Sequence, residues 1–136
     1  MKLVVIESPY AGNIEKNVKY ARECLKHSLA RGEAPIASHL LYTQPGVLSD
    51  NIPGERAKGI AAGLAWLGVA DAHVFYTDHG WSKGMIAGLK YRLAMTQLIP
   101  PQLVLRNLWG ETKLPLVKEF TREQNRLIME AALSNG

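Results

Sequence analysis

Four short, continuous apolar runs divide the chain, and stretches with a helical spacing of apolar residues lie between them. The runs occupy residues 2–7, 34–41, 72–77 and 102–108, and the second ends near Ser38 and His39. They are rich in Val, Ile and Leu and do not alternate with polar residues, which is typical of parallel strands that are covered on both faces. We therefore predict four short, buried strands.

Helices are predicted between and after these strands. Asn13 can cap the first helix, and Arg31 followed by Gly32 ends it. The apolar residues that recur along it at helical spacing are Ile14, Val18, Ala21, Leu25 and Leu29. Residues 43–53 form a loop, and further helices are expected at 53–68 and 82–95. A last helix is expected from Pro115, with Val117, Phe120, Leu127 and Ala131 on its buried face.

The helix expected at residues 53–68 differs from the others because its interior, residues 59–67, is apolar almost all round. Such a helix either packs on two sides or lies in a subunit interface. We expect the chain to form a homo-oligomer through residues 54–68.

Strands and helices alternate along the whole chain, and parallel strands need helical crossovers of this kind. The expected fold is a single α/β domain over residues 1–136. It contains one doubly wound, mostly parallel sheet of four to five strands with helices on both faces, of the Rossmann-like or flavodoxin-like type. Folds of this type bind ligands at the carboxyl ends of their strands.

Composition narrows the possible functions only a little. The chain is 47% apolar and 21% charged, and its one cysteine excludes an internal disulfide framework. There is no apolar run of about 18 residues and no signal-peptide pattern at the start, so a cytoplasmic protein without a membrane partner is expected. The net charge of +4 suits an anionic ligand, but the basic residues are scattered, and no nucleic-acid partner is expected.

The turn after the third strand, residues 77–84, has the clearest features of a ligand site. Ser82 stands where a helix N-cap belongs, and free backbone N–H groups there favour an anion. Lys83 adds positive charge, and Gly80 and Gly84 allow a close approach to the backbone. The alternative is that Ser82 is only a cap and that the glycines only form the turn.

Two other strand-end loops add candidates. In the loop after the first strand, Tyr10 can stack on a base or bind a sugar, or it can simply pack; Trp81 has the same two interpretations. The predicted ligand-binding residues are Ser8, Tyr10, Gly12, His39, Gly80, Trp81, Ser82, Lys83 and Gly84.

The candidates for acid, base or nucleophile chemistry are Glu7, Asp71 and Asp78, with His39 and His79 as alternatives. Glu7 directly follows the apolar residues of the first strand, which places it at the edge where ligands are expected. No histidine or cysteine spacing suits a metal, and neither a P-loop nor a dinucleotide fingerprint occurs, so no metal or cofactor is expected.

Three motifs together resemble those of the nucleoside 2-deoxyribosyltransferase-like superfamily, which includes the deoxynucleoside monophosphate N-hydrolases. They are Ser8-Pro9-Tyr10-Ala11-Gly12, Asp71-Ala72, and the segment from Asp78 to Gly84, and the resemblance covers residues 2–108. It implies a nucleoside or nucleotide ligand, with Tyr10 and Gly12 at the base and sugar and the Ser82 turn at a phosphate or the sugar edge. It also implies cleavage of the N-glycosidic bond by a glutamate in the helix that follows the third strand.

The sequence departs from that pattern in this helix. Between Asp78 and Glu111 there is no Asp or Glu, and the positions for the glutamate hold Met85, Ile86, Ala87 and Gly88. We therefore predict a nucleoside- or nucleotide-binding protein that does not cleave its ligand. The alternative is an N-glycosidic hydrolase or deoxyribosyltransferase in which Glu7 or Asp78 is catalytic.

Overall fold

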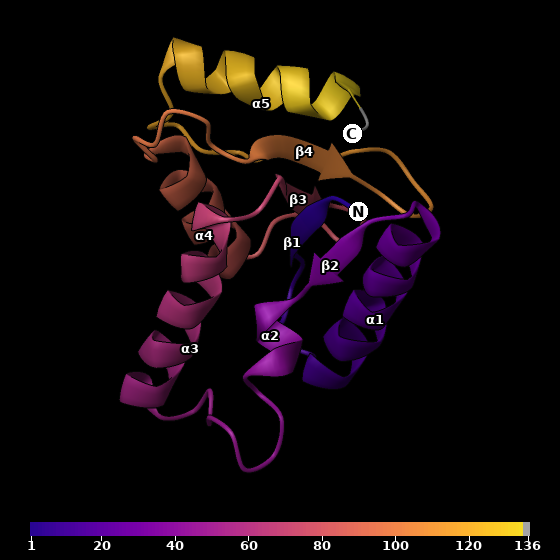
Figure 1. The fold of residues 1–136 in the computed structure, drawn as a ribbon, viewed down its shortest axis with the longest axis vertical. Helices are drawn as coiled ribbons and strands as arrows, with labels where there is room; N and C mark the ends of the chain where they lie inside the picture. The colour runs from indigo at the N-terminus through magenta and orange to yellow at the C-terminus, as the bar shows by residue number, and fades with distance from the viewer. Residues whose placement is uncertain (135–136) are drawn as a thin grey trace.

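A computed structural model describes residues 1–134 and contains one sheet of four strands with helices on both faces (Figure 1). The strands are β1 (Leu3–Glu7), β2 (Ala34–Ile36), β3 (Ala72–Tyr76) and β4 (Gln102–Arg106). Their order in the sheet is β2-β1-β3-β4, and all pairings are parallel. This confirms the predicted doubly wound α/β fold, and residues 135 and 136 of the predicted domain lie outside the described residues.

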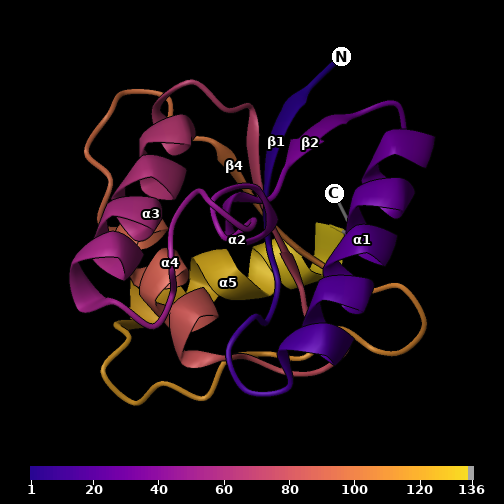
Figure 2. The same ribbon diagram turned by 90° about the horizontal axis from the view of Figure 1, so that it is seen from below.

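The path of the chain reverses once, between β2 and β3. Helix α1 (Ile14–Ala30) carries the chain from β1 to the edge strand β2. The short α2 (Ser38–Leu41), then α3 (Pro53–Ala65) and the 3₁₀ turn η1 (Trp66–Gly68) bring it back across the sheet to β3. Helix α4 (Lys83–Leu93) leads on to β4, and α5 (Arg122–Ser134) follows. Figure 2 shows α1 on one side of the strands and α3 and α4 on the other.

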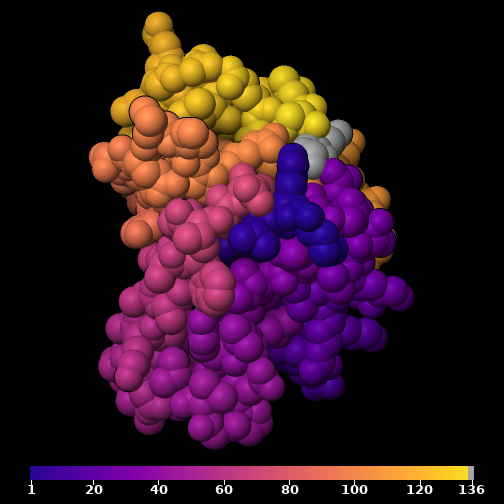
Figure 3. All heavy atoms as spheres, viewed as in Figure 1, coloured from indigo at the N-terminus to yellow at the C-terminus, as the bar shows by residue number. Residues whose placement is uncertain are grey.

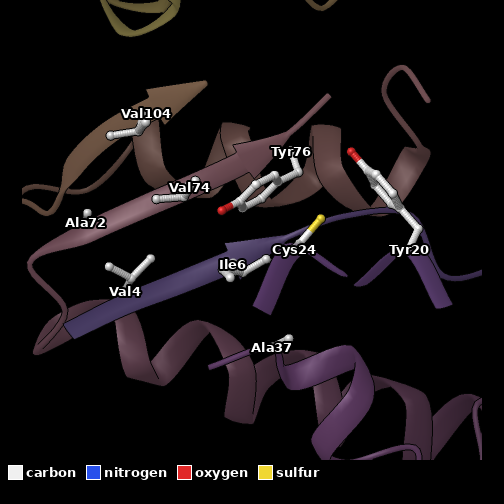
Figure 4. Close-up of a cluster of buried hydrophobic side chains, with 9 residues drawn as sticks. All are labelled: Val4, Ile6, Tyr20, Cys24, Ala37, Ala72, Val74, Tyr76 and Val104. Carbon is white, nitrogen blue, oxygen red and sulfur yellow. The ribbon is translucent and has the colours of Figure 1, made fainter. Parts of the chain in front are cut away.

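Side chains from alternate strand positions form two cores, one on each face of the sheet. On the first face, Val4, Ile6, Val74 and Tyr76 pack with Tyr20 and Cys24 of α1 (Figure 4). The residues of the second core come from β3, β4, α4 and α5; they are Phe75, Leu103, Leu105, Met85, Leu89, Ile128 and Ala131. In the space-filling view, α5 covers the β4 end of the molecule (Figure 3).

The buried face of α1 coincides with the predicted apolar stripe only in part, at Ala21 and at the partly buried Leu25. Its buried residues are Asn17, Tyr20, Ala21, Cys24 and Ser28, whereas Ile14 and Leu29 are 44% and 56% exposed. Two of the buried residues, Asn17 and Ser28, are polar, and their burial is possible because each has hydrogen-bond partners in the fold. The Asn17 amide donates to the carbonyls of Tyr10 and Ala11, and the Ser28 hydroxyl donates to Glu33. The predicted cap by Asn13 is confirmed, since its side chain accepts a hydrogen bond from the Lys16 N–H.

The second strand is shorter than the predicted run at 34–41. It ends at Ile36, and Ser38–Leu41 form α2. β2 is an edge strand that contains Pro35, which has no N–H group for further pairing. The chain then turns at Ala37, whose carbonyl accepts from the N–H groups of Leu40 and Leu41.

The last helix begins at Arg122, so the predicted start at Pro115 is wrong. Thr121 and Gln124 form a reciprocal capping box: the Thr121 hydroxyl accepts from the Gln124 N–H, and the Gln124 side chain accepts from the Thr121 N–H. Of the predicted face, Ala131 is buried and Leu127 half-buried, while Val117 and Phe120 precede the helix.

Helix α3 is exposed along one side, so of the two alternatives for this helix, packing on two sides within the chain does not apply. Ile60 and Trp66 are 49% and 43% exposed. Gly59 and Gly63 face inward instead. A Cβ atom at Gly63 would lie 2.4 Å from the Ser38 hydroxyl oxygen, so this glycine allows α2 to lie directly against α3.

A buried ion pair lies on the first face of the sheet and links the end of β4 to the residue before β2. Arg106 at the end of β4 donates from both terminal guanidinium nitrogens to the Glu33 carboxylate, at 2.9 and 3.0 Å. Glu33 precedes β2 and also accepts from Ser28, while Arg106 donates to the Tyr76 hydroxyl. Burial opposes ionisation of Glu33, but the hydrogen bonds from Arg106 and Ser28 prevail and lower its pKa to about 2.

We expect Glu33→Gln to destabilise the fold by about 3–5 kcal/mol, because it leaves the buried Arg106 charge without its carboxylate. The pKa of Glu33 is lowered from 4.5 to about 2, so the charged pair contributes its full stability above pH 4.5. That contribution is lost as the pH falls from 4.5 towards 2, and the variant should lack this part of the acid dependence. Urea unfolding at several pH values measures both effects, and Glu130→Gln at an exposed ion pair is the control. Equal losses in the two variants would contradict the prediction.

Candidate functional site

A cleft of about 720 Å³ opens beside the carboxyl end of β1. It is lined by three segments that are far apart in the sequence, namely the loop after β1, the turn into α2 and the N-terminus of α4. The predicted site residues in its lining are Glu7, Ser8, Tyr10, Gly12, His39, Ser82, Lys83 and Gly84. The topology explains this meeting, because the connections after β1 and β3 leave the sheet on opposite faces at the point where the strand order reverses.

The fourth wall of the cleft was not predicted. It consists of the loop after α2 and one side of α3, and its residues include Tyr42, Leu48, Asp50, Arg56, Ile60 and Leu64. The sequence signal that indicates it is the spacing of Gly59 and Gly63, one helical turn apart, which marks the side of α3 that receives α2. This packing places α2, with His39, directly beside α3.

Glu7 lies in the cleft lining, at the end of β1. Its side chain is 18% exposed, and one carboxylate oxygen, Oε1, lies 3.5 Å from Nε2 of the buried His73. The other oxygen, Oε2, lies beside Gly88 of α4, where a Cβ atom would be only 2.6 Å away. The absence of a side chain at Gly88 therefore makes room for the Glu7 carboxylate.

Ser8 and His39 form a hydrogen bond across the cleft lining, with 2.7 Å between the Ser8 hydroxyl and Nε2 of His39. Burial lowers the pKa of His39, and the nearby Glu7 charge opposes that effect only partly. A neutral imidazole with its proton on Nδ1 accepts this hydrogen bond from the Ser8 hydroxyl at Nε2, whereas one with its proton on Nε2 donates it to the Ser8 oxygen. The edge of the His39 ring also faces Tyr10, with 6.4 Å between the ring centres.

The N-terminus of α4 forms another part of the lining. The Ser82 hydroxyl accepts from the Met85 N–H at 3.2 Å, which confirms the predicted cap. The next residue, Lys83, is exposed. Among the other charged lining residues, Arg56 lies 3.5 Å from Asp50, and Glu55 accepts from the Ser49 N–H. The N-terminus of α4 and the Lys83 side chain together favour an anionic group in this part of the cleft.

Asp78 lies outside the cleft, although it was a catalytic candidate. Its carboxylate accepts from the Tyr20 hydroxyl at 2.5 Å and from the N–H groups of Leu108 and Trp109 at 2.8 and 2.9 Å. Burial opposes its ionisation, but these hydrogen bonds prevail and lower the pKa of Asp78. A carboxylate held in this way ties the chain after β4 to the end of β3.

Gly80 and Trp81, two predicted ligand-binding residues, are also absent from the cleft lining. Gly80 has φ = 80° and forms the turn. The Trp81 ring stacks on Phe75, with 5.1 Å between the ring centres, and its indole N–H donates to the Lys113 carbonyl at 2.8 Å. These contacts fit the alternatives given for the two residues from the sequence, namely that Gly80 only forms the turn and that Trp81 packs within the fold.

Residues 1–134 contain neither a cluster of metal-binding side chains nor a helix that could span a membrane. In this part of the chain, no three His, Cys, Asp or Glu side chains gather closely enough to hold a metal ion. None of its helices is long and apolar enough to span a membrane.

We expect Asp78→Asn to lower the free energy of unfolding by about 1–3 kcal/mol, because the amide replaces charge-assisted hydrogen bonds to the 108–110 backbone. Glu7→Gln is the matched control. The Glu7 carboxylate accepts no hydrogen bond of normal length in the described structure, so this substitution should leave the free energy of unfolding nearly unchanged. Urea unfolding of both variants measures the difference. A larger loss for Glu7→Gln would show that the two roles are reversed.

Comparison with known proteins places the chain in a family. No curated protein and no solved structure matches it. Residues 2–99 match the model of a domain of unknown function, DUF7768. The matched range contains the sheet strands β1 to β3 and every cleft segment described above. Since it spans more than half of the sequence, the chain belongs to the DUF7768 family.

Proposed function

We propose that the cleft binds a nucleoside or nucleotide. The observation that carries this proposal is that the loop after β1 and the Ser82 turn line one cleft. These are the two segments to which the resemblance to nucleoside 2-deoxyribosyltransferases assigns the ligand contacts. The topology brings both loops to one edge of the sheet, and the proposal is supported because they also line a cavity of about 720 Å³ there.

The chemistry of the lining suits such a ligand. Tyr10, Ile60 and Leu64 offer aromatic and aliphatic surface to a base or sugar. Lys83 and the N-terminus of α4 offer positive charge to a phosphate or to sugar hydroxyls. A lining that combines apolar surface with a few polar and charged groups is typical of small-molecule sites.

A second candidate function is cleavage of the N-glycosidic bond, with Glu7 as the nucleophile. The observation that favours it is that the Glu7 carboxylate fills the space beside Gly88, on the helix where the resemblance places a catalytic glutamate. A carboxylate oxygen would attack the anomeric carbon as the carbon–nitrogen bond breaks, and the base would leave with the electron pair and take up a proton. Water would then attack the glycosyl ester, release the sugar and restore the carboxylate.

We also propose that the protein assembles into a homo-oligomer through residues 54–68. The end of this segment presents Trp66 and Val69, which are 43% and 65% exposed and do not line the cleft. Exposed apolar side chains that lie close together on a surface are typical of an interface. A solution mass equal to the 15.0 kDa of one chain would contradict this assembly.

Titration calorimetry with nucleosides and their 5′-monophosphates tests the binding proposal. We expect at least one of these ligands to bind, and Lys83→Met to weaken a phosphorylated ligand by about tenfold, or about 1.4 kcal/mol. Lys90→Met, on the same helix but outside the cleft, is the control and should bind like the wild type. If no ligand of either class binds at millimolar concentration, the proposal is wrong.

Chromatographic detection of released base tests cleavage. Glu7→Gln should reduce base release by about a thousandfold or more, because an amide cannot act as the nucleophile. Gly88→Ala should also reduce it, because the new Cβ displaces the flexible end of Glu7, while Gly54→Ala, which meets nothing within 4 Å, is the control. In the double variant Glu7→Ala, Gly88→Glu the carboxylate reaches the same space from the helix, and activity should return in part. Binding without base release by the wild type would exclude this second function.

A further inference from the structure

His73 is a buried polar residue that neither core explains. It lies in β3, which is otherwise composed of Ala72, Val74, Phe75 and Tyr76, and its side chain is fully buried. Neither ring nitrogen makes a hydrogen bond within the described structure. An imidazole left in this state costs free energy that an apolar residue would not, so its presence requires a reason.

Within residues 1–134, the acidic side chain that lies within 4 Å of the ring is Glu7. Val5 pairs with His73 and Glu7 pairs with Phe75, so His73 and Glu7 project from the same face of neighbouring strands. The separation of 3.5 Å between Nε2 and Oε1 is slightly longer than an ordinary hydrogen bond. Contacts of this kind commonly shorten when a site is occupied.

The two oxygens of Glu7 have different surroundings. Oε1 faces His73 within the sheet, and Oε2 faces Gly88, which belongs to the cleft lining. The His73 ring is fixed in turn by Phe75, with 4.4 Å between the ring centres. A rigid donor on one oxygen leaves the other as the oxygen that a ligand in the cleft can reach.

We propose that His73 is a positioning residue for Glu7, which donates from Nε2 to Oε1 and thereby directs Oε2 into the cleft. The proposal rests on the proposed function in one respect, namely that Glu7 acts on the ligand. It requires the tautomer with the proton on Nε2, which leaves only the lone pair of Nδ1 unpaired. His39 cannot take this role, because its Nε2 is engaged by Ser8.

Nitrogen-15 NMR of the ligand-free protein tests the contact itself, without reference to any function. We expect the neutral His73 ring to carry its proton on Nε2, and we expect this proton signal to move in Glu7→Gln. The Nδ1–H tautomer, or an Nε2 proton signal that is identical in wild type and Glu7→Gln, would overturn the proposal. Both measurements use folded proteins that retain His73.

Two substitutions of His73 then test the effect on the ligand. His73→Gln keeps an N–H donor, and His73→Leu fills the volume without one. With a 5′-monophosphate that the wild type binds or cleaves, we expect His73→Leu to lose tenfold or more in affinity or in base release. His73→Gln should recover most of that loss, whereas a role in packing alone predicts no such recovery, and thermal unfolding of both variants shows that they are folded.

The two proposals fail in different ways. If the wild-type protein neither binds nor cleaves any nucleoside or nucleotide, the proposed function is contradicted. The NMR result still decides whether His73 donates a hydrogen bond to Glu7. A wild-type protein that acts on a nucleotide, with an equally active and folded His73→Leu, contradicts the positioning role and leaves the proposed function standing.

Discussion

The parallel pairing of β1 with β3 is the constraint on which the rest of this molecule depends. The two strands are neighbours although α1, β2 and α3 separate them in the sequence. Because both run in the same direction, their carboxyl ends open at the same edge of the sheet, while the chain leaves them towards opposite faces. The cleft, its glutamate and the N-terminus of α4 all derive from this one pairing.

The two faces of the sheet are stabilised in different ways. The second face has α4 and α5 packed on apolar side chains of β3 and β4. The first face near β4 instead carries the Arg106–Glu33 pair, which ties the last strand to the chain before β2. This pair joins segments at opposite edges of the strand order, so it fixes the span of the sheet on the side that α1 covers.

Much of the fold was predictable because burial on both faces leaves continuous apolar runs. β1, β3 and β4 lie within the predicted runs, and the predicted caps at Asn13 and Ser82 are present. The errors arose where distant contacts override local spacing. Asn17 and Ser28 are buried on α1 because carbonyls and a carboxylate elsewhere in the fold pair with them.

The candidate site was likewise predicted where topology determines it and missed where distant contacts determine it. The strand-end loops were predicted because the topology alone requires them to lie at one edge of the sheet. The α3 wall was missed because its place depends on how closely α2 approaches Gly63, which is a tertiary fact. The place of Asp78 outside the cleft was missed for a related reason, since its partners at 108–110 lie some thirty residues further along the chain.

The position of Glu7 on a strand has a mechanical consequence. A carboxylate carried by α4 would move as one body with Ser82 and Lys83 whenever that helix shifted. Glu7 is instead anchored in the sheet through the pairing of β1 with two neighbours, and Gly88 lets α4 pass over it without a fixed contact. Glu7 and Lys83 are therefore carried by different elements, the sheet and α4, and the distance between them depends on how α4 packs on the sheet.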